Sequence, residues 1–88
     1  MSDITEALKE LPDWRHENDA LVARFRFKSF MNAIAFMSGC ATYCDEHNHH
    51  PTWTNTYRTI DISLTTHDAG NKVTMKDVEL ARFMSGLF

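Results

Sequence analysis

The segment from residue 20 to 27 constrains the fold most strongly, because its side chains alternate in character along an extended chain. One side of this segment is entirely apolar, consisting of Leu21, Ala23, Phe25 and Phe27. The other side carries Val22, Arg24 and Arg26. A period of two with one apolar face is typical of a half-buried strand whose other face meets water. The segment therefore predicts a strand of a sheet that is covered on one face only.

The next segment predicts a long helix, from a cap at Ser29 to about Asn48, that is apolar over an unusually wide face. One helical stripe consists of Phe30, Ile34, Met37, Ala41 and Cys44, and a neighbouring stripe of Ala33, Phe36, Cys40 and Tyr43. Two adjacent stripes make a face wider than packing on one sheet usually needs. Either the monomer buries both stripes, or part of the face packs on another subunit, and we favour the second interpretation.

The remaining periodicities complete the fold. A first helix runs from a possible capping box, Asp3 with Glu6, to Leu11, where Pro12 ends it. Short strands are predicted at 14–17, 52–57 and 59–66, although the last two could form one bent strand, and 67–71 is predicted as a loop. A capping box of Thr74 with Asp77 begins a final helix. The order α-β-β-α-β-β-α predicts an α+β fold with two layers, a four-stranded antiparallel sheet and helices on one face.

Composition excludes several other classes of protein. A chain of 88 residues, without repeats or linkers, predicts a single domain over 1–88. Nine basic and twelve acidic residues give a net charge of −3, which argues against nucleic acid as a partner. No stretch is long and apolar enough to cross a membrane, and the first residues lack a basic secretory start, so we expect no membrane partner and a cytoplasmic protein. Two cysteines do not form a disulfide framework.

The histidines are the residues that suggest a catalytic function. If the strands at 52–57 and 59–66 pair as a hairpin, the chain brings His67 beside the His49-His50-Pro51 turn. Three imidazoles with Asp45 nearby could supply both an acid and a base near neutral pH without a cofactor. The alternative is that His-His-Pro forms only a polar turn, and we interpret His16 and His47 as ordinary surface residues.

A metal site is the second possibility that these residues raise. Cys40, Cys44 and His47 fall on one side of the predicted helix, and two more histidines follow. The spacing C-x3-C without a second pair of ligands does not match a zinc motif, and both cysteines lie in apolar stripes, where a thiol acts as a small hydrophobe. We therefore predict no metal.

The pattern from Asp45 onward resembles the signature of the pterin-4a-carbinolamine dehydratases. An acidic residue, three intervening positions and His-His-Pro are followed by an aromatic residue six positions after Pro51, a histidine ten further on and a later aspartate. The resemblance extends over nearly the whole chain, through Trp14, the Arg24–Phe27 strand, Phe30, Phe36-Met37, the Pro51–Trp53 segment and the Leu64–His67 segment.

The resemblance implies a specific reaction and a specific site. Family members dehydrate 4a-hydroxytetrahydropterin to quinonoid dihydropterin without metal or cofactor, in the recycling of tetrahydrobiopterin-type cofactors. By resemblance, the catalytic residues are His49, His50 and His67, with acid and base roles shared by His50 and His67 while His49 orients the pterin. The substrate-binding residues implied in the same way are Asp45, Pro51, Trp53, Thr66 and Asp68. Asp77 is explained by its capping box, so we leave it outside the catalytic set.

Two positions depart from the family pattern, and a second function stays open. Asp45 is shorter than the glutamate common at its position, and Ala69 replaces a cysteine of animal relatives. The family also contains dimerisation partners of a homeodomain transcription factor. The alternative to an enzyme is therefore a partner-binding module with the same fold. Because the core of so short a chain is marginal, we expect a homodimer or homotetramer with a pterin as substrate.

Overall fold

The computed structural model describes residues 2–88, without the side chains of Ser2 and Asp3. The elements are α1 (Ser2–Leu8), β1 (Arg15–Glu17), β2 (Ala20–Arg26), α2 (Phe30–His47), β3 (Thr52–Thr56), β4 (Thr59–Leu64), a short 3-10 turn (His67–Ala69) and α3 (Met75–Leu87). This order confirms the predicted α-β-β-α-β-β-α arrangement. The predicted Asp3–Glu6 capping box lies outside the described residues, because it depends on the Asp3 side chain.

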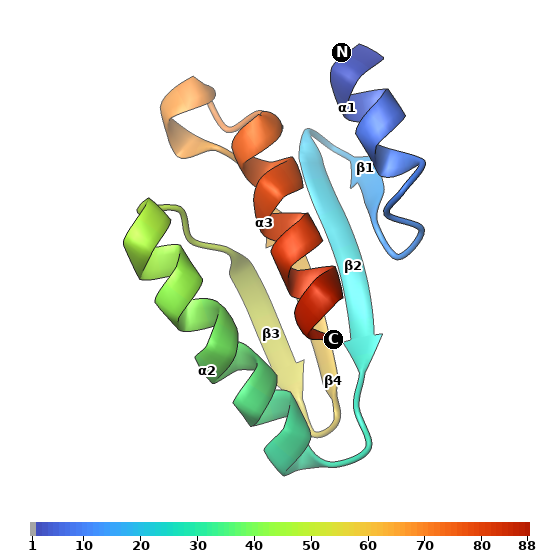
Figure 1. Ribbon diagram of the computed structural model, residues 1–88, viewed down its shortest axis with the longest axis vertical. Helices are drawn as coiled ribbons and strands as arrows, with labels where there is room; N and C mark the ends of the chain where they lie inside the picture. Colours follow the sequence, from blue (N-terminus) through green and yellow to red (C-terminus); the bar gives the residue numbers. More distant parts are fainter. Residues whose placement is uncertain (1) are drawn as a thin grey trace.

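The four strands form one antiparallel sheet in the order β1-β2-β4-β3. Leu21, Ala23 and Phe25 of β2 lie opposite Leu64, Ile62 and Ile60 of β4. The three helices cover this apolar face, and the other face of the sheet stays open (Figure 1). The alternation in 20–27 therefore has the predicted cause: one side of β2 packs against the helices and the other faces water.

Phe25 is the centre of the core. Its ring stacks on Phe88 at 4.5 Å between centroids and meets the edges of Trp14 and Phe36 at 5.8 and 5.6 Å. The indole N–H of Trp14 donates to the Ser85 hydroxyl at 2.9 Å, so this buried donor is satisfied. These contacts join both ends of the chain to the middle of the sheet.

Two element ends differ from their predicted positions by more than one residue, and the structure also decides between a hairpin and one bent strand. Helix α1 ends at Leu8 rather than Leu11, because residues 9–11 continue in tighter turns whose N–H groups bond three residues back. Strand β4 ends at Leu64 rather than Thr66, which instead pairs with Lys72 and closes the following loop. Tyr57 has a φ of 53°, so β3 and β4 form a hairpin and not one bent strand.

Helix α2 buries one of its two apolar stripes more completely than the other. Ser29 caps the helix as predicted, accepting from the Asn32 N–H at 3.0 Å. Ala33, Phe36 and Cys40 are buried, whereas Phe30, of the other stripe, is 45% exposed. In the stripe that contains Phe30, Ile34 and Met37 are half-buried and Ala41 is exposed, and only Cys44 is buried. The width of the apolar face therefore exceeds what this chain alone covers.

Two leucines of α3 test this description of the core. Leu80 is fully buried, whereas Leu87 is 46% exposed. We expect Leu80→Ala to lower the free energy of unfolding by about 2–5 kcal/mol, because it leaves a cavity that the core cannot fill. Leu87→Ala is the matched control and should cost less than about half as much. Urea unfolding followed by circular dichroism measures both, and equal losses would contradict the assigned core.

Candidate functional site

The three predicted histidines line one hollow at the end of the sheet. Its volume is about 230 Å³, and its walls are Asn48, His49, His50, Thr65, Thr66, His67, Asp68 and Lys76. These residues come from the exit of α2, the segment after β4 and the first turn of α3, which lie at the same end of the molecule (Figure 1). Residues far apart in the sequence therefore meet around one space.

The exit of α2 explains how the histidine pair reaches this space. Asn48 caps the helix in the left-handed conformation, with φ of 50° and ψ of 45°, which asparagine tolerates better than most residues. The His49 N–H still donates to the Cys44 carbonyl at 3.1 Å, so His49 stays against the helix end. Strand β3 then begins at Thr52, opposite Ser63 of β4. This register puts the segment after β4, with His67, beside the His-His-Pro turn, as the hairpin argument predicted.

His49 is held by a buried carboxylate. It is 8% exposed, and its Nε2–H donates to Oδ1 of the fully buried Asp77 at 2.7 Å. The other oxygen of Asp77, Oδ2, accepts from the Thr66 hydroxyl at 2.8 Å and from the Thr74 N–H at 2.9 Å. Asp77 therefore fixes the position of His49 and the orientation of its ring.

The capping box on Asp77 is confirmed, but capping is not its only contact. The sequence interpretation left this residue out because the helix start accounted for it. The structure adds a second contact, since this carboxylate caps α3 with one oxygen and holds His49 with the other. The position of Asp77 in the family pattern was the signal that pointed to it.

His50 and His67 are different from His49 because water reaches both. His50 Nε2 lies 3.2 Å from Asp45 Oδ1, and His67 Nδ1 lies 3.8 Å from Asp68 Oδ1. The His67 side chain is 91% exposed. Each exposed imidazole thus has a carboxylate near it, and each is accessible to solvent.

The structure does not bring all the predicted binding residues into the hollow. Thr66 and Asp68 line it, and Asp45 lies beside it through His50. Pro51 and Trp53 are not among its walls. Trp53 packs against the core from β3. Conversely, Asn48, Thr65 and Lys76 line the hollow although we did not single them out, since no motif marks isolated loop residues or a first-turn lysine.

The two cysteines are buried in the helical layer. Both are free thiols, and burial raises the pKa of Cys40 to about 12. A thiol that stays protonated at neutral pH is a poor nucleophile and a poor metal ligand. Among the residues that the structure describes, no three His, Cys, Asp or Glu side chains cluster in a way that could hold a metal ion. Nor does any described helix have the length and apolar character needed to cross a bilayer.

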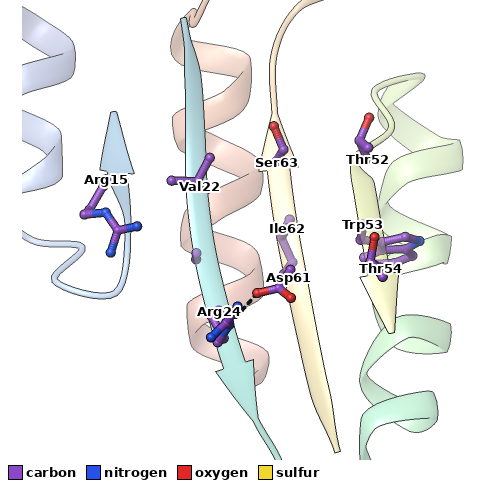
Figure 2. A pocket seen from close by; sticks show the side chains of 10 residues that line it. Arg15, Val22, Arg24, Thr52, Trp53, Thr54, Asp61, Ile62 and Ser63 are labelled. Atoms are coloured by element: carbon purple, nitrogen blue, oxygen red, sulfur yellow. Dashed lines mark hydrogen bonds and ion pairs between the residues drawn. The ribbon is translucent and has the colours of Figure 1, made fainter. Parts of the chain in front are cut away.

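A larger depression lies on the open face of the sheet but offers different chemistry. Its volume is about 480 Å³, and strands β1 to β4 form its floor. Figure 2 shows Arg24 and Asp61 pointing toward each other there, and their ion pair measures 2.6 Å. The hydrogen bond to Asp61 raises the pKa of Arg24, so this guanidinium cannot serve as a base. The histidine hollow is therefore a better candidate site for proton transfer than this depression.

Comparison with known proteins identifies the family of this chain. The family model described as pterin 4 alpha carbinolamine dehydratase matches residues 1–87. A protein of Opitutus terrae, provisionally named a pterin-4-alpha-carbinolamine dehydratase, is 51% identical over 81 residues, which cover 92% of this chain and 84% of the relative. A protein of Rhodopseudomonas palustris with the same provisional name is 45% identical over 87 residues, covering 97% of this chain and 85% of its own.

A solved structure is also similar. The "transcriptional coactivator/pterin dehydratase" of Brucella melitensis superposes with a TM-score of 0.90 at 38% identity, covering 98% of this chain and 93% of the other. The histidines of the family pattern line one hollow. Because the family model matches residues 1–87 of its 88 residues, this chain belongs to the pterin 4 alpha carbinolamine dehydratase family.

Proposed function

We propose that this protein dehydrates 4a-hydroxytetrahydropterin to quinonoid dihydropterin by general acid and base catalysis. The observation that carries the proposal is the meeting of His49, His50 and His67 around one hollow. Family membership supplies the substrate class. Aromatic amino acid hydroxylases produce substrates of this class, so the role we propose is the recycling of a tetrahydrobiopterin-type cofactor.

The reaction needs one proton donor and one proton acceptor at adjacent atoms. The C4a–O bond breaks, and the oxygen leaves as water after it takes a proton from an acid. A base removes the proton from N5, and the electron pair of that N–H bond forms the C4a=N5 double bond. One imidazolium and one neutral imidazole satisfy both requirements near neutral pH.

The exposure of the three histidines supports a division of roles. His50 and His67 can recover their protonation states from solvent, because both are accessible, so they act as the acid and base. His49 is fixed by Asp77 and is the residue that orients the ring. Thr66 and Asp68 line the same hollow and contribute to pterin binding. Asp45 orients His50 through the contact between its Oδ1 and the His50 Nε2. The substrate-binding roles of Pro51 and Trp53 stay predictions, since neither residue lines the hollow.

Self-association and a cytoplasmic location complete the proposal. The stripe of α2 that contains Phe30, Met37 and Ala41 is incompletely covered by its own chain, and a second copy of the protein would cover it. A homodimer or homotetramer would also enlarge a small core. Two free, buried thiols fit a reducing compartment.

A partner-binding module with no activity is the competing function. The Brucella melitensis neighbour carries both descriptions in its name, and the wide face of α2 could serve a different protein. The following three measurements distinguish the two functions and test the parts of the site separately.

Substitution of the exposed histidines tests the catalytic assignment. We expect His50→Ala and His67→Ala each to lower the rate of dehydration by about 10²- to 10⁴-fold, because each removes one proton-transfer group. The double variant should retain no acceleration over the uncatalysed reaction. Spectroscopic assay of synthetic 4a-hydroxytetrahydropterin measures the rates, with the exposed His16→Ala of β1 as the matched control. Unchanged turnover in the double variant would refute the assignment.

Removal of the Asp77 carboxylate tests the network that fixes His49. Asp77→Ala leaves the donors of His49, Thr66 and Thr74 without their acceptor, so the free energy of unfolding should fall by at least ~2 kcal/mol. Asp77→Asn, which keeps the shape and one acceptor oxygen, should lose less. The control is Asp68→Ala, whose 91% exposed side chain predicts a change within about 0.5 kcal/mol. Similar denaturant midpoints for Asp77→Ala and Asp68→Ala would show that the network contributes no stability.

Light scattering after size exclusion tests self-association. The mass should be two or four times the 10.2 kDa of one chain. Ala41→Glu places a charge on the uncovered stripe of α2 and should shift the mass toward a single chain, because burying an unpaired carboxylate is unfavourable. Ala69→Glu, at another exposed alanine outside this helix, is the control. A single-chain mass for the unmodified protein across micromolar concentrations would contradict the proposal.

A further inference from the structure

The depression on the open face of the sheet is separate from the histidine hollow. It is the larger of the two spaces, with a volume of about 480 Å³ against about 230 Å³, and no residue lines both. The proposed reaction therefore gives this depression no role. An inference about it also stands independently of the dehydratase function.

Two arginines from neighbouring strands face this depression. Arg15 of β1 lies opposite Val22 of β2, and Arg24 follows two residues later on the same side of β2. Diagonal neighbours of this kind have Cβ atoms about 7–8 Å apart, a distance that long side chains span. The side chains of Arg15 and Arg24 are 72% and 71% exposed, and Figure 2 shows both on the open face. Two guanidinium groups can therefore reach the same ligand.

A carboxylate orients each guanidinium and leaves most of its donors free for a ligand. The Arg15 Nε–H donates to Glu17 Oε2 at 2.6 Å, and the Arg24 Nε–H donates to Asp61 Oδ1 at 2.6 Å. Neither contact uses the two Nη atoms, which carry four further N–H donors on each arginine. A guanidinium that is fixed at Nε presents this Nη edge in one direction, which favours two parallel hydrogen bonds to an anionic group such as a phosphate.

Hydroxyl groups form the other side of the depression. Ser63 of β4 is the cross-strand partner of Thr52 of β3, and Thr54 lies opposite Asp61 on the same face. Figure 2 shows these side chains beside the Arg24–Asp61 pair. A hydroxyl can both donate and accept, and the Asp61 carboxylate accepts. This side of the depression therefore suits a ligand that itself carries hydroxyl groups.

The kind of side chain that is missing narrows the ligand class further. Among the described residues that line the depression, the only aromatic one is Trp53, and it packs against the core beside Ile62 on the other face of the sheet. Proteins that bind nucleic-acid strands usually stack the bases on exposed aromatic rings. A base would find no such ring here, whereas a sugar phosphate needs only charged groups and hydroxyls.

We propose that the open face of the sheet binds a sugar phosphate. The phosphate accepts hydrogen bonds from the Nη groups of Arg15 and Arg24, and the sugar hydroxyls bond with Thr52, Thr54 and the Asp61 carboxylate. The chain as a whole has a net charge of −3, so it does not attract anions in general, and binding depends on these two arginines. Because the site is shallow and open to water, the affinity should be modest, with a Kd of about 1 mM.

Titration of ribose 5-phosphate into 15N-labelled protein, followed by NMR at constant pH and ionic strength, tests the proposal. We expect saturable shifts of the amide signals of β2, β3 and β4 around the depression. Ribose lacks the phosphate, and inorganic phosphate lacks the sugar, so each should bind at least ~10-fold more weakly than ribose 5-phosphate.

Substitutions of one arginine make the test specific. Arg24→Gln should raise the Kd for ribose 5-phosphate about ten-fold, because a charge-assisted contact with the phosphate is lost. Arg24→Lys keeps the charge but not the planar fork, so its Kd should be intermediate. The matched control is Arg82→Gln on α3, which removes another exposed arginine that pairs with a carboxylate and should leave the Kd unchanged. Thermal melts by circular dichroism verify that each variant is folded.

Each possible outcome decides for or against the site. No saturable shift, shifts confined to the histidine hollow, or an unchanged Kd in Arg24→Gln would overturn it. Equal losses in Arg24→Gln and Arg82→Gln would show attraction to surface charge alone and would overturn it as well. Equal affinities for inorganic phosphate and ribose 5-phosphate would refute the sugar phosphate as the ligand class. The rate of pterin dehydration should not change in Arg24→Gln, so the failure of one proposal leaves the other standing.

Discussion

The buried carboxylate of Asp77 is the interaction on which the site depends. A carboxylate that is removed from water is costly unless its oxygens accept hydrogen bonds, and here three donors from three segments of the chain supply them. His49 comes from the exit of α2, Thr66 from the segment after β4 and Thr74 from the start of α3. The need to satisfy one buried group thus joins the three segments that form the histidine hollow.

This arrangement separates a fixed imidazole from two exchangeable ones. His49 is packed and bonded within the protein, whereas His50 and His67 stand at the surface with carboxylates nearby. A reaction that moves one proton onto an oxygen and another off a nitrogen benefits from both kinds, because orientation needs rigidity and proton exchange needs access to water. The depression on the open face of the sheet is larger, but no histidine is among the residues that line it.

Much of the fold could be predicted because local patterns agree with tertiary packing. The alternation of β2, the cap at Ser29 and the capping box at Thr74 each follow from a few neighbouring residues, and each is confirmed. Element ends were less predictable, since they depend on distant partners. Thr66 has strand-like neighbours, but it leaves the sheet to pair with Lys72 and to bond Asp77.

The order of elements, the apolar face of the sheet and the spacing that marks the histidines could all be predicted from the sequence, because they depend on periodicity and on short-range hydrogen bonds. The contact of Asp77 with His49, the place of Lys76 in the wall of the histidine hollow and the position of Trp53 outside it became known only from the packing of the chain. The physical reason is that a cavity belongs to no single segment. Its walls depend on how helices and strands that are far apart in the chain pack together. A local sequence pattern carries no information about that packing.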